Sequence, residues 1–315
     1  ARVACDIPSG VESDSGALLS EVPTFDLTVT FGALKPAHRL VPAMHKCGRV
    51  VLADIGVDAS TEWTEIGAPQ LPALEPGGNK YSRGLVSILS GQMPGAVALA
   101  STAAARAGAG TVRLYASDMV ANVPAAVVQG KVWEAEDQDK AVLLIGPGLG
   151  RDEFARSRLA EALSIGRPLV LDADALQLVT PEEIANANLP EPPILTPHHG
   201  EFESLFGELG GSKAEQALEA ARRAKAVVVY KGPDTIVAAP DGRVGFAPPA
   251  PAWLASAGTG DVLAGIAASF LAQGLPAFEA AAASVWVHGR AAELAGPRMI
   301  ADDLAAAIPA ALDLP

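Results

Sequence analysis

Short hydrophobic runs alternate with helical patterns along most of the chain. Runs this short and this continuously apolar are typical of parallel strands buried on both faces, and the segments between them have helical spacing. The pattern predicts an α/β fold with a doubly wound, largely parallel sheet and helices on both faces. The expected strands are residues 85–89, 111–115, 141–145, 168–171, 193–195 and 227–230, and the expected helices are residues 95–107 and 152–163.

The last third of the chain changes pattern. Residues 235–239 and 243–246 are joined by a Pro-Asp-Gly turn, which predicts a β-hairpin. From Asp261 onward the chain reads as helical, and Gly274 and Gly296 are expected helix stops.

Residues 1–58 contain only two short β-like runs, 27–31 and 50–54, which is too little for an independent domain. Residues 59–78 are rich in Pro, Gly and Glu, and we interpret them as a linker to a domain at 79–315. The chain starts without Met, with residues that resemble the interior of a buried strand, so we expect a fragment or a processed chain.

The composition excludes several classes of partner. Half of the residues are hydrophobic, which is enough for a substantial core, and the net charge is −13. No basic stripe is present, so we do not expect nucleic acid as a partner. No apolar run reaches the roughly 20 residues of a membrane span. The two cysteines, Cys5 and Cys47, suit a reduced, cytoplasmic protein.

Ligands of parallel sheets bind at the carboxyl ends of the strands, so the loops there carry the candidate chemistry. Gly258-Thr259-Gly260-Asp261 brings small residues and a helix start together, which favours a phosphate site, with Asp261 as a general base. An ordinary Asp cap explains the same pattern. Lys231-Gly232-Pro233-Asp234-Thr235 could contact phosphates or form a plain turn.

Two further loops are less specific. His198, His199 and Glu201 follow a strand, but neighbouring histidines diverge in direction, so we do not favour a metal site. Residues 146–150 (GPGLG) match neither standard phosphate-binding fingerprint. The carboxylates at 172 and 174 could hold Mg²⁺ through water or cap the next helix.

Taken together, seven motifs in this order resemble the ADP/ATP-dependent NAD(P)H-hydrate dehydratase family, which has a ribokinase-like fold. They are residues 80–84, 93–96, 146–150, 172–176, 196–198, 231–235 and 258–265. Two departures from the family pattern are Gln92, where Gly is usual, and residues 251–253, which replace an Asn-x-Gly stretch.

The resemblance implies a role for individual residues. The positions expected to contact the hydrated nicotinamide nucleotide are Ala96, Gly150, His198 and Asp261, with Asp261 catalytic. The positions expected to contact the adenine nucleotide are Lys231, Gly232, Pro233, Asp234, Thr235 and Gly260. The implied cofactors are ADP or ATP with Mg²⁺.

Residues 6–10, 14–16 and 28–36 resemble the C-terminal part of the NAD(P)H-hydrate epimerase domain, a Rossmann-like α/β domain often fused ahead of the dehydratase. This resemblance implies that Asp6 contacts the hydrate and that Ser9 helps to bind K⁺. The upstream part of that domain is missing from residues 1–58.

The expected reaction is metabolite repair: phosphorylation of the hydrate hydroxyl and elimination of phosphate restore NADH or NADPH. Two alternatives stay open. One is a ribokinase-like kinase for a small molecule such as a vitamin precursor, and the other is a non-catalytic nucleotide-binding protein. We also expect a homo-oligomer.

Overall fold

A ten-stranded sheet organises the larger part of this computed structural model, which describes residues 1–73, 77–80, 82–131, 133 and 141–313. Its strand order is β4-β13-β12-β11-β10-β9-β8-β5-β6-β7. The strands are β4 (Trp63–Glu65), β5 (Leu85–Leu89), β6 (Thr111–Tyr115), β7 (Val128–Gly130), β8 (Ala141–Ile145), β9 (Leu169–Leu171), β10 (Ile194–Leu195), β11 (Val227–Tyr230), β12 (Ile236–Ala238) and β13 (Val244–Phe246).

The pairing confirms the expected largely parallel sheet. Neighbouring strands are parallel except at β12, which runs antiparallel to both β11 and β13 and forms the predicted hairpin. The central strands are buried along their whole length, as their continuous apolar sequences require. Strand β7 was not expected from the sequence.

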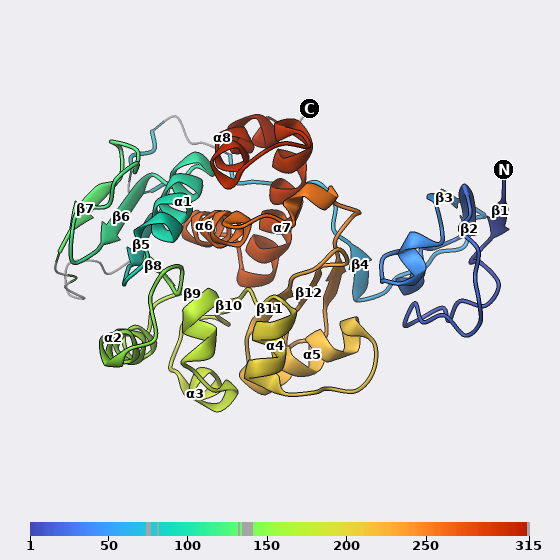
Figure 1. The fold of residues 1–315 in the computed structure, drawn as a ribbon, viewed down its shortest axis with the longest axis horizontal. Helices are drawn as coiled ribbons and strands as arrows, with labels where there is room; N and C mark the ends of the chain where they lie inside the picture. Colours follow the sequence, from blue (N-terminus) through green and yellow to red (C-terminus); the bar gives the residue numbers. More distant parts are fainter. Residues whose placement is uncertain (74–76, 81, 132, 134–140, 314–315) are drawn as a thin grey trace.

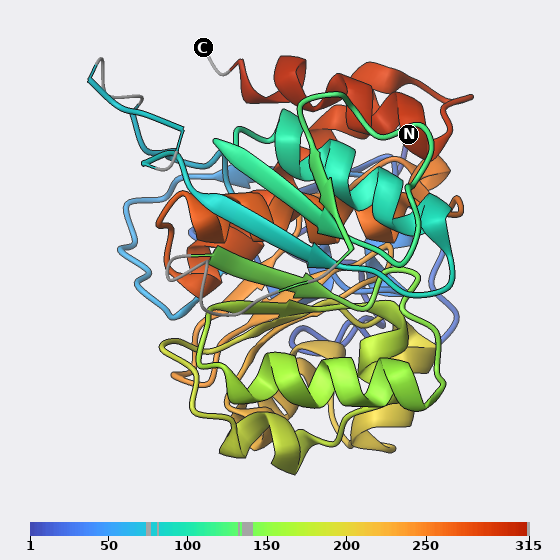
Figure 2. The same ribbon diagram turned by 90° about the vertical axis from the view of Figure 1, so that its left-hand side faces the viewer.

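Helices cover both faces of the sheet and make three layers (Figure 2). One face carries α1 (Pro94–Arg106), α6 (Thr259–Ala272), α7 (Ala277–Ala295) and α8 (Ala301–Leu312) (Figure 1). The other carries α2 (Glu153–Ser164), α3 (Pro181–Asn186), α4 (His199–Phe206) and α5 (Lys213–Ala224). Each face has its own continuous hydrophobic core.

Small residues allow α1 and α6 to pack closely. A Cβ on Gly265 would lie 2.3 Å from the carbonyl oxygen of Ala100, so a larger residue there would separate the two helices. The expected helix stops are confirmed, since Gly274 and Gly296 have φ values of +91° and +87° just beyond α6 and α7. Helix α6 begins at Thr259, two residues before the expected start.

The N-terminal segment forms a separate three-stranded parallel sheet, β1 (Val3–Cys5), β2 (Leu27–Phe31) and β3 (Arg49–Ala53). It lies beside β4 at one end of the molecule (Figure 1). Its core is small, with Val11, Val22, Ala37 and Ala43 as buried members. Both cysteines are free thiols. No helix within the described residues is long and apolar enough to cross a membrane.

The segment expected to be a linker, residues 59–78, is partly structured. Trp63–Glu65 forms β4, which pairs in parallel with β13 and extends the large sheet. Glu65 of this strand forms an ion pair with Arg39 of the N-terminal segment. Residues 74–76 and Tyr81, which belong to the predicted linker and to the first motif, lie outside the described residues.

Candidate functional site

The candidate residues gather at the topological switch point of the large sheet. From β5 the chain proceeds outward to β6 and β7, and it then returns to β8 and builds the sheet in the other direction. The loops after β5 and β8 therefore diverge, and a crevice at such a point is where ligands of open α/β sheets bind. Ala96 lies in the first turn of α1 after β5, and Gly150 follows β8.

The turn that starts α6, residues 258–261, has Gly258 as its N-cap residue, with φ of +86°. Gly258 has no side chain to cap the helix, and Asp261 sits in the first turn. Its carboxylate accepts no hydrogen bond from the described part of the chain. The interpretation of this residue as an ordinary cap is therefore wrong.

Burial and neighbouring carboxylates raise the pKa of Asp261 to about 7, against the opposing charge of Lys231. Asp172, Glu201 and Asp174 all contribute to this rise. A carboxyl group with a pKa near the working pH can both accept and return a proton, which is the property a general base needs.

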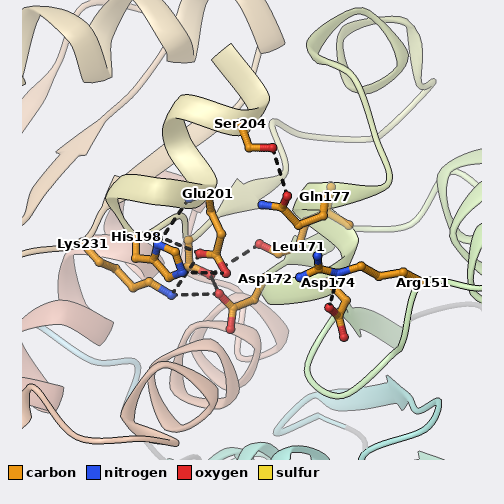
Figure 3. A network of polar contacts seen from close by, with 10 residues as sticks. Arg151, Leu171, Asp172, Asp174, Gln177, His198, Glu201, Ser204 and Lys231 are labelled. Carbon is orange, nitrogen blue, oxygen red and sulfur yellow. Dashed lines mark hydrogen bonds and ion pairs between the residues drawn. The ribbon is translucent and has the colours of Figure 1, made fainter. Parts of the chain in front are cut away.

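Lys231 belongs to a buried polar network (Figure 3), and its charge also acts on Asp261. Its ammonium lies 3.0 Å from Oδ1 of Asp172 and 3.9 Å from Oε2 of Glu201. Thr196 donates a hydrogen bond of 2.7 Å to the same Asp172 oxygen. Burial disfavours the charge of Lys231, but the carboxylates outweigh it and raise its pKa, so the ammonium stays charged.

Lys231 also approaches the α6 turn. A Cβ on Gly260 would lie 3.2 Å from the Lys231 ammonium, so glycine leaves room for this cation at the helix start. The first turn of α6 and the loop after β11 therefore meet as the motifs predicted. A positive helix end beside a fixed ammonium is a suitable environment for phosphate.

The loop at 146–150 packs against other loops of the protein. A Cβ on Gly146 would lie 1.7 Å from the carbonyl oxygen of Asp172, so this glycine serves close backbone packing. Asp174 accepts a 3.0 Å hydrogen bond from the Gly150 amide and pairs with Arg151 at 2.8 Å. Asp172 occupies the N-cap position of the short helix at 173–177, but its side chain makes no capping hydrogen bond, and both carboxylates have partners elsewhere.

His198 is the N-cap residue of α4 and forms a capping box with Glu201. The Glu201 amide donates to Nδ1 of His198 at 3.2 Å, and the rest of the imidazole is largely exposed. His199 instead contacts the hydroxyl of Tyr230 at 2.7 Å. No group of three potential metal ligands among His, Cys, Asp and Glu occurs in the described residues.

The comparisons with known proteins agree with this geometry. Residues 86–310 match the NAD(P)H-hydrate dehydratase family, and residues 1–37 match the YjeF-related protein N-terminus. The first match covers more than half of the chain. The chain belongs to the NAD(P)H-hydrate dehydratase family. The family expected from the motifs is thus confirmed.

Curated relatives support the same assignment. The bifunctional NAD(P)H-hydrate repair enzyme Nnr of Mycobacterium tuberculosis is 39% identical over 303 residues, covering 89% of this chain and 60% of the relative. The enzyme of the same name from Escherichia coli is 34% identical over 332 residues, covering 96% and 63%. The chain therefore spans less than two thirds of the length of these relatives.

Solved structures confirm the ribokinase-like fold. An ADP/ATP-dependent NAD(P)H-hydrate dehydratase from Bacillus subtilis, co-crystallised with ATP/Mg²⁺, is 31% identical with a TM-score of 0.68, covering 76% of this chain and 93% of that one. A ribokinase-like superfamily protein from Enterococcus faecalis, at 23% identity and a TM-score of 0.69, covers 81% and 97%. The second supports the fold alone.

The remaining dehydratase motif, residues 231–235, forms a tight loop. Thr235 accepts from the Gly232 amide at 3.1 Å and donates to the Gly232 carbonyl at 2.8 Å. The carboxylate of Asp234, expected at the nucleotide, is buried against Lys213. The structure therefore gives this side chain an internal partner.

One half-buried group beside the α6 turn was missed from the sequence. His288 of α7 lies 2.8 Å from the Thr259 carbonyl oxygen in the first turn of α6. Burial lowers the pKa of His288 to about 4, so the imidazole is neutral and donates through Nε2. A lone histidine in an Ala-rich helix carries no sequence signal for this contact.

The N-terminal residues lie apart from this site. Asp6 follows β1 with φ of +66°, and its carboxylate pairs with Lys35 and accepts from Thr30 at 2.9 Å. Burial opposes the charge of Asp6, but these partners outweigh it and lower its pKa. Ser9 is exposed on the loop that follows.

Proposed function

We propose that residues 79–315 convert hydrated NADH or NADPH, the S epimer, back to the dihydronicotinamide form, coupled to hydrolysis of ADP or ATP. The observation that carries the proposal is Asp261, whose carboxylate has no hydrogen-bond partner in the described residues and whose pKa is raised to about 7. It lies beside the Lys231 ammonium and a helix N-terminus, and family membership supplies the substrate class.

The first step is phosphoryl transfer. The hydrate oxygen attacks the terminal phosphorus, its proton passes to Asp261, and the bond from phosphorus to the leaving phosphate oxygen breaks. Lys231 and the amides of the α6 turn stabilise the charge on the transferring group. His288 holds that turn through the Thr259 carbonyl.

The second step is elimination. The phosphate leaves with the electron pair of its carbon–oxygen bond, assisted by the ring nitrogen lone pair, and loss of a proton from the adjacent ring carbon restores the double bond. A hydroxyl is a poor leaving group and a phosphate is a good one. Nucleotide hydrolysis therefore drives the dehydration.

A divalent cation fits the charge of this site. The carboxylates of Asp172, Asp174 and Glu201 all act on Asp261, so these four acidic groups exceed the two cations paired with them, Lys231 and Arg151. Oxygen ligands of this kind suit Mg²⁺, which usually enters with substrate phosphates rather than in an all-protein cage. We propose that Mg²⁺ would neutralise the nucleotide phosphates, and that Asp172 and Asp174 would hold it through water.

The remaining contacts in the proposal follow the family motifs. Ala96, Gly150 and His198 would contact the hydrate, and the 231–235 loop with Gly260 would contact the adenine nucleotide. The half-buried Ala96 and the exposed edge of the His198 ring are compatible with such contacts.

The test is recovery of NADH absorbance when the protein is mixed with hydrated NADH, Mg²⁺ and either ATP or ADP. We expect nucleotide-dependent recovery and stoichiometric release of phosphate. A phosphorylated product that persists, without recovered absorbance, would identify a ribokinase-like kinase instead. Nucleotide binding without any turnover would identify a non-catalytic protein.

For the remaining chain, we propose that residues 1–58 are the end of an epimerase domain, joined by residues 59–78 to the dehydratase domain. Asp6 would contact the hydrate and Ser9 would help to bind K⁺ there. We also propose a homo-oligomer, which light scattering of the purified chain would test. The bifunctional relatives, which are longer than this chain, support the proposal that residues 1–58 are the end of an epimerase domain.

A further inference from the structure

A partly buried lysine outside the predicted site bridges the 231–235 loop. The ammonium of Lys213, at the start of α5, lies 2.5 Å from Oδ1 of Asp234 and 3.4 Å from the carbonyl oxygen of Lys231. It also lies 4.6 Å from the centre of the Tyr230 ring. One cation therefore holds both ends of the loop against the strand that precedes it.

The N-terminal segment reaches the same carboxylate. The amide of Val41 donates to Oδ2 of Asp234 at 3.1 Å, across 193 positions of sequence. Next to it, Leu40 is buried in the core of the large domain, and Arg39 pairs with Glu65 of β4. Asp234, only 3% exposed, is thus contacted by Lys213 of the large domain and by Val41 of the N-terminal segment.

These contacts leave the loop little freedom. A Cβ on Gly232 would lie 2.4 Å from the Lys213 ammonium, so a larger residue there would displace the end of the Lys213 side chain. The Lys231 amide donates to the Pro197 carbonyl at 2.9 Å, which ties the loop to the strand end before His198. The loop geometry in turn directs the Lys231 side chain toward Asp172.

We infer that Lys213 and residues 39–41 are positioning groups that act through Asp234, so that nucleotide affinity depends on how the N-terminal segment docks on the large domain. This inference rests on the proposed function for the identity of the ligand. The Asp234 side chain then orders the loop, while the loop backbone and Lys231 face the nucleotide.

The main test is the affinity for ATP with Mg²⁺, measured by calorimetry on Lys213→Met. If the competent loop conformation falls to about a tenth of the population, the Kd for ATP rises about tenfold. The KM for the hydrate should stay within about twofold, because the hydrate contacts lie on other loops. Arg223→Met is the matched control, since it removes a cation and an exposed ion pair from the same helix.

Lys213→Met leaves the Asp234 charge buried and unpaired, which threatens folding. The double variant Lys213→Met, Asp234→Asn removes both charges and keeps an oxygen for the Val41 amide. We expect it to fold and still to bind ATP about tenfold more weakly. Wild-type ATP affinity in the folded double variant would overturn the inference, as would equal losses for ATP and hydrate.

The N-terminal contact is tested with Arg39→Gln, which breaks the ion pair to Glu65. We expect the Kd for ATP to rise about two- to threefold, whereas Arg49→Gln on β3 should leave it unchanged. Equal ATP affinities of the two variants would overturn the role of the segment.

Calorimetry needs no turnover, so a wild-type protein that binds ATP but restores no NADH refutes the proposed function alone. A wild-type protein that binds no ATP refutes the inference.

Discussion

Two aspartates, one in the loop after β11 and one in the first turn of α6, each have a lysine nearby but have opposite environments. Asp234 is buried, and it pairs with Lys213 and accepts from the Val41 amide. Asp261 faces Lys231, but its carboxylate accepts no hydrogen bond from the described residues, and its neighbours include three other carboxylates.

The difference separates structural from chemical carboxylates. A carboxylate with internal hydrogen-bond partners, such as Asp234, is held in place by them and orders its surroundings. A buried carboxylate without donors, surrounded by like charges, has a pKa near neutrality and is ready to exchange a proton. The same residue type therefore orders a loop in one region and, in the proposed function, accepts a proton in the other.

The largest effect is expected for Asp261→Asn. The amide keeps the shape but cannot accept the hydroxyl proton, so turnover should fall by about 10² to 10⁴. The variant should fold and bind ATP normally, which distinguishes it from a binding defect. Steady-state recovery of NADH absorbance measures the loss. Turnover near that of the wild type would show that Asp261 is not the base.

Lys231→Met should weaken both stability and binding. It leaves Asp172 and Glu201 facing each other without their cation, and removing one partner of a buried pair costs about 3–5 kcal/mol. Chemical denaturation measures this loss. Adding Asp172→Asn to Lys231→Met should recover part of the stability but not the ATP affinity. Full recovery of ATP affinity would contradict a direct role for Lys231.

Periodicity was sufficient for most of the fold. The buried strands β5 and β8 are where the apolar runs placed them, because strands buried on both faces need continuous apolar sequence, and the partly buried β6 also has the expected bounds. Helices α3 and α5 were missed, although Thr180 with Glu183 and Ser212 with Glu215 form capping boxes, which are a sequence signature of a helix N-terminus. Strand β4 depends on pairing with β13, which no local pattern reveals.

The site was only partly predictable for the same reason. The motifs identified the loops of Lys231 and Asp261, and the sheet brings these loops together. The partners of each side chain are set by packing between distant segments. The Asp172 pairing of Lys231 spans 59 positions, and the contact between His288 and Thr259 spans 29. Neither follows from spacing along the chain.

The pH dependence of turnover tests the raised pKa that distinguishes Asp261 from Asp234. If Asp261 is the base, as we propose, its pKa of about 7 requires turnover to rise through neutral pH and to fall to about a tenth of its plateau one pH unit below. A pH–rate profile of kcat measures this limb. A limb centred near pH 4, the ordinary carboxyl value, would contradict the raised pKa.

The free energy of unfolding should fall with rising pH, whereas turnover should rise. The folded pKa of Asp261 lies above its unfolded value, so the folded state binds more protons between about pH 4 and pH 7 and loses stability as pH rises through that window. Asp261→Asn should remove this loss. Denaturation midpoints of the two proteins should therefore diverge with rising pH, with the variant the more stable above about pH 7.

The smallest effect is expected for Thr235→Val, which tests the loop's own hydrogen bonds against its external support. The substitution keeps the volume but removes the hydroxyl that joins the Gly232 amide and carbonyl, at a cost of about 1 kcal/mol. If Lys213 and Val41 hold the loop through Asp234, the KM for ATP should rise only about two- to threefold. A rise larger than that of Lys213→Met would show that the loop orders itself and that Asp234 contributes little.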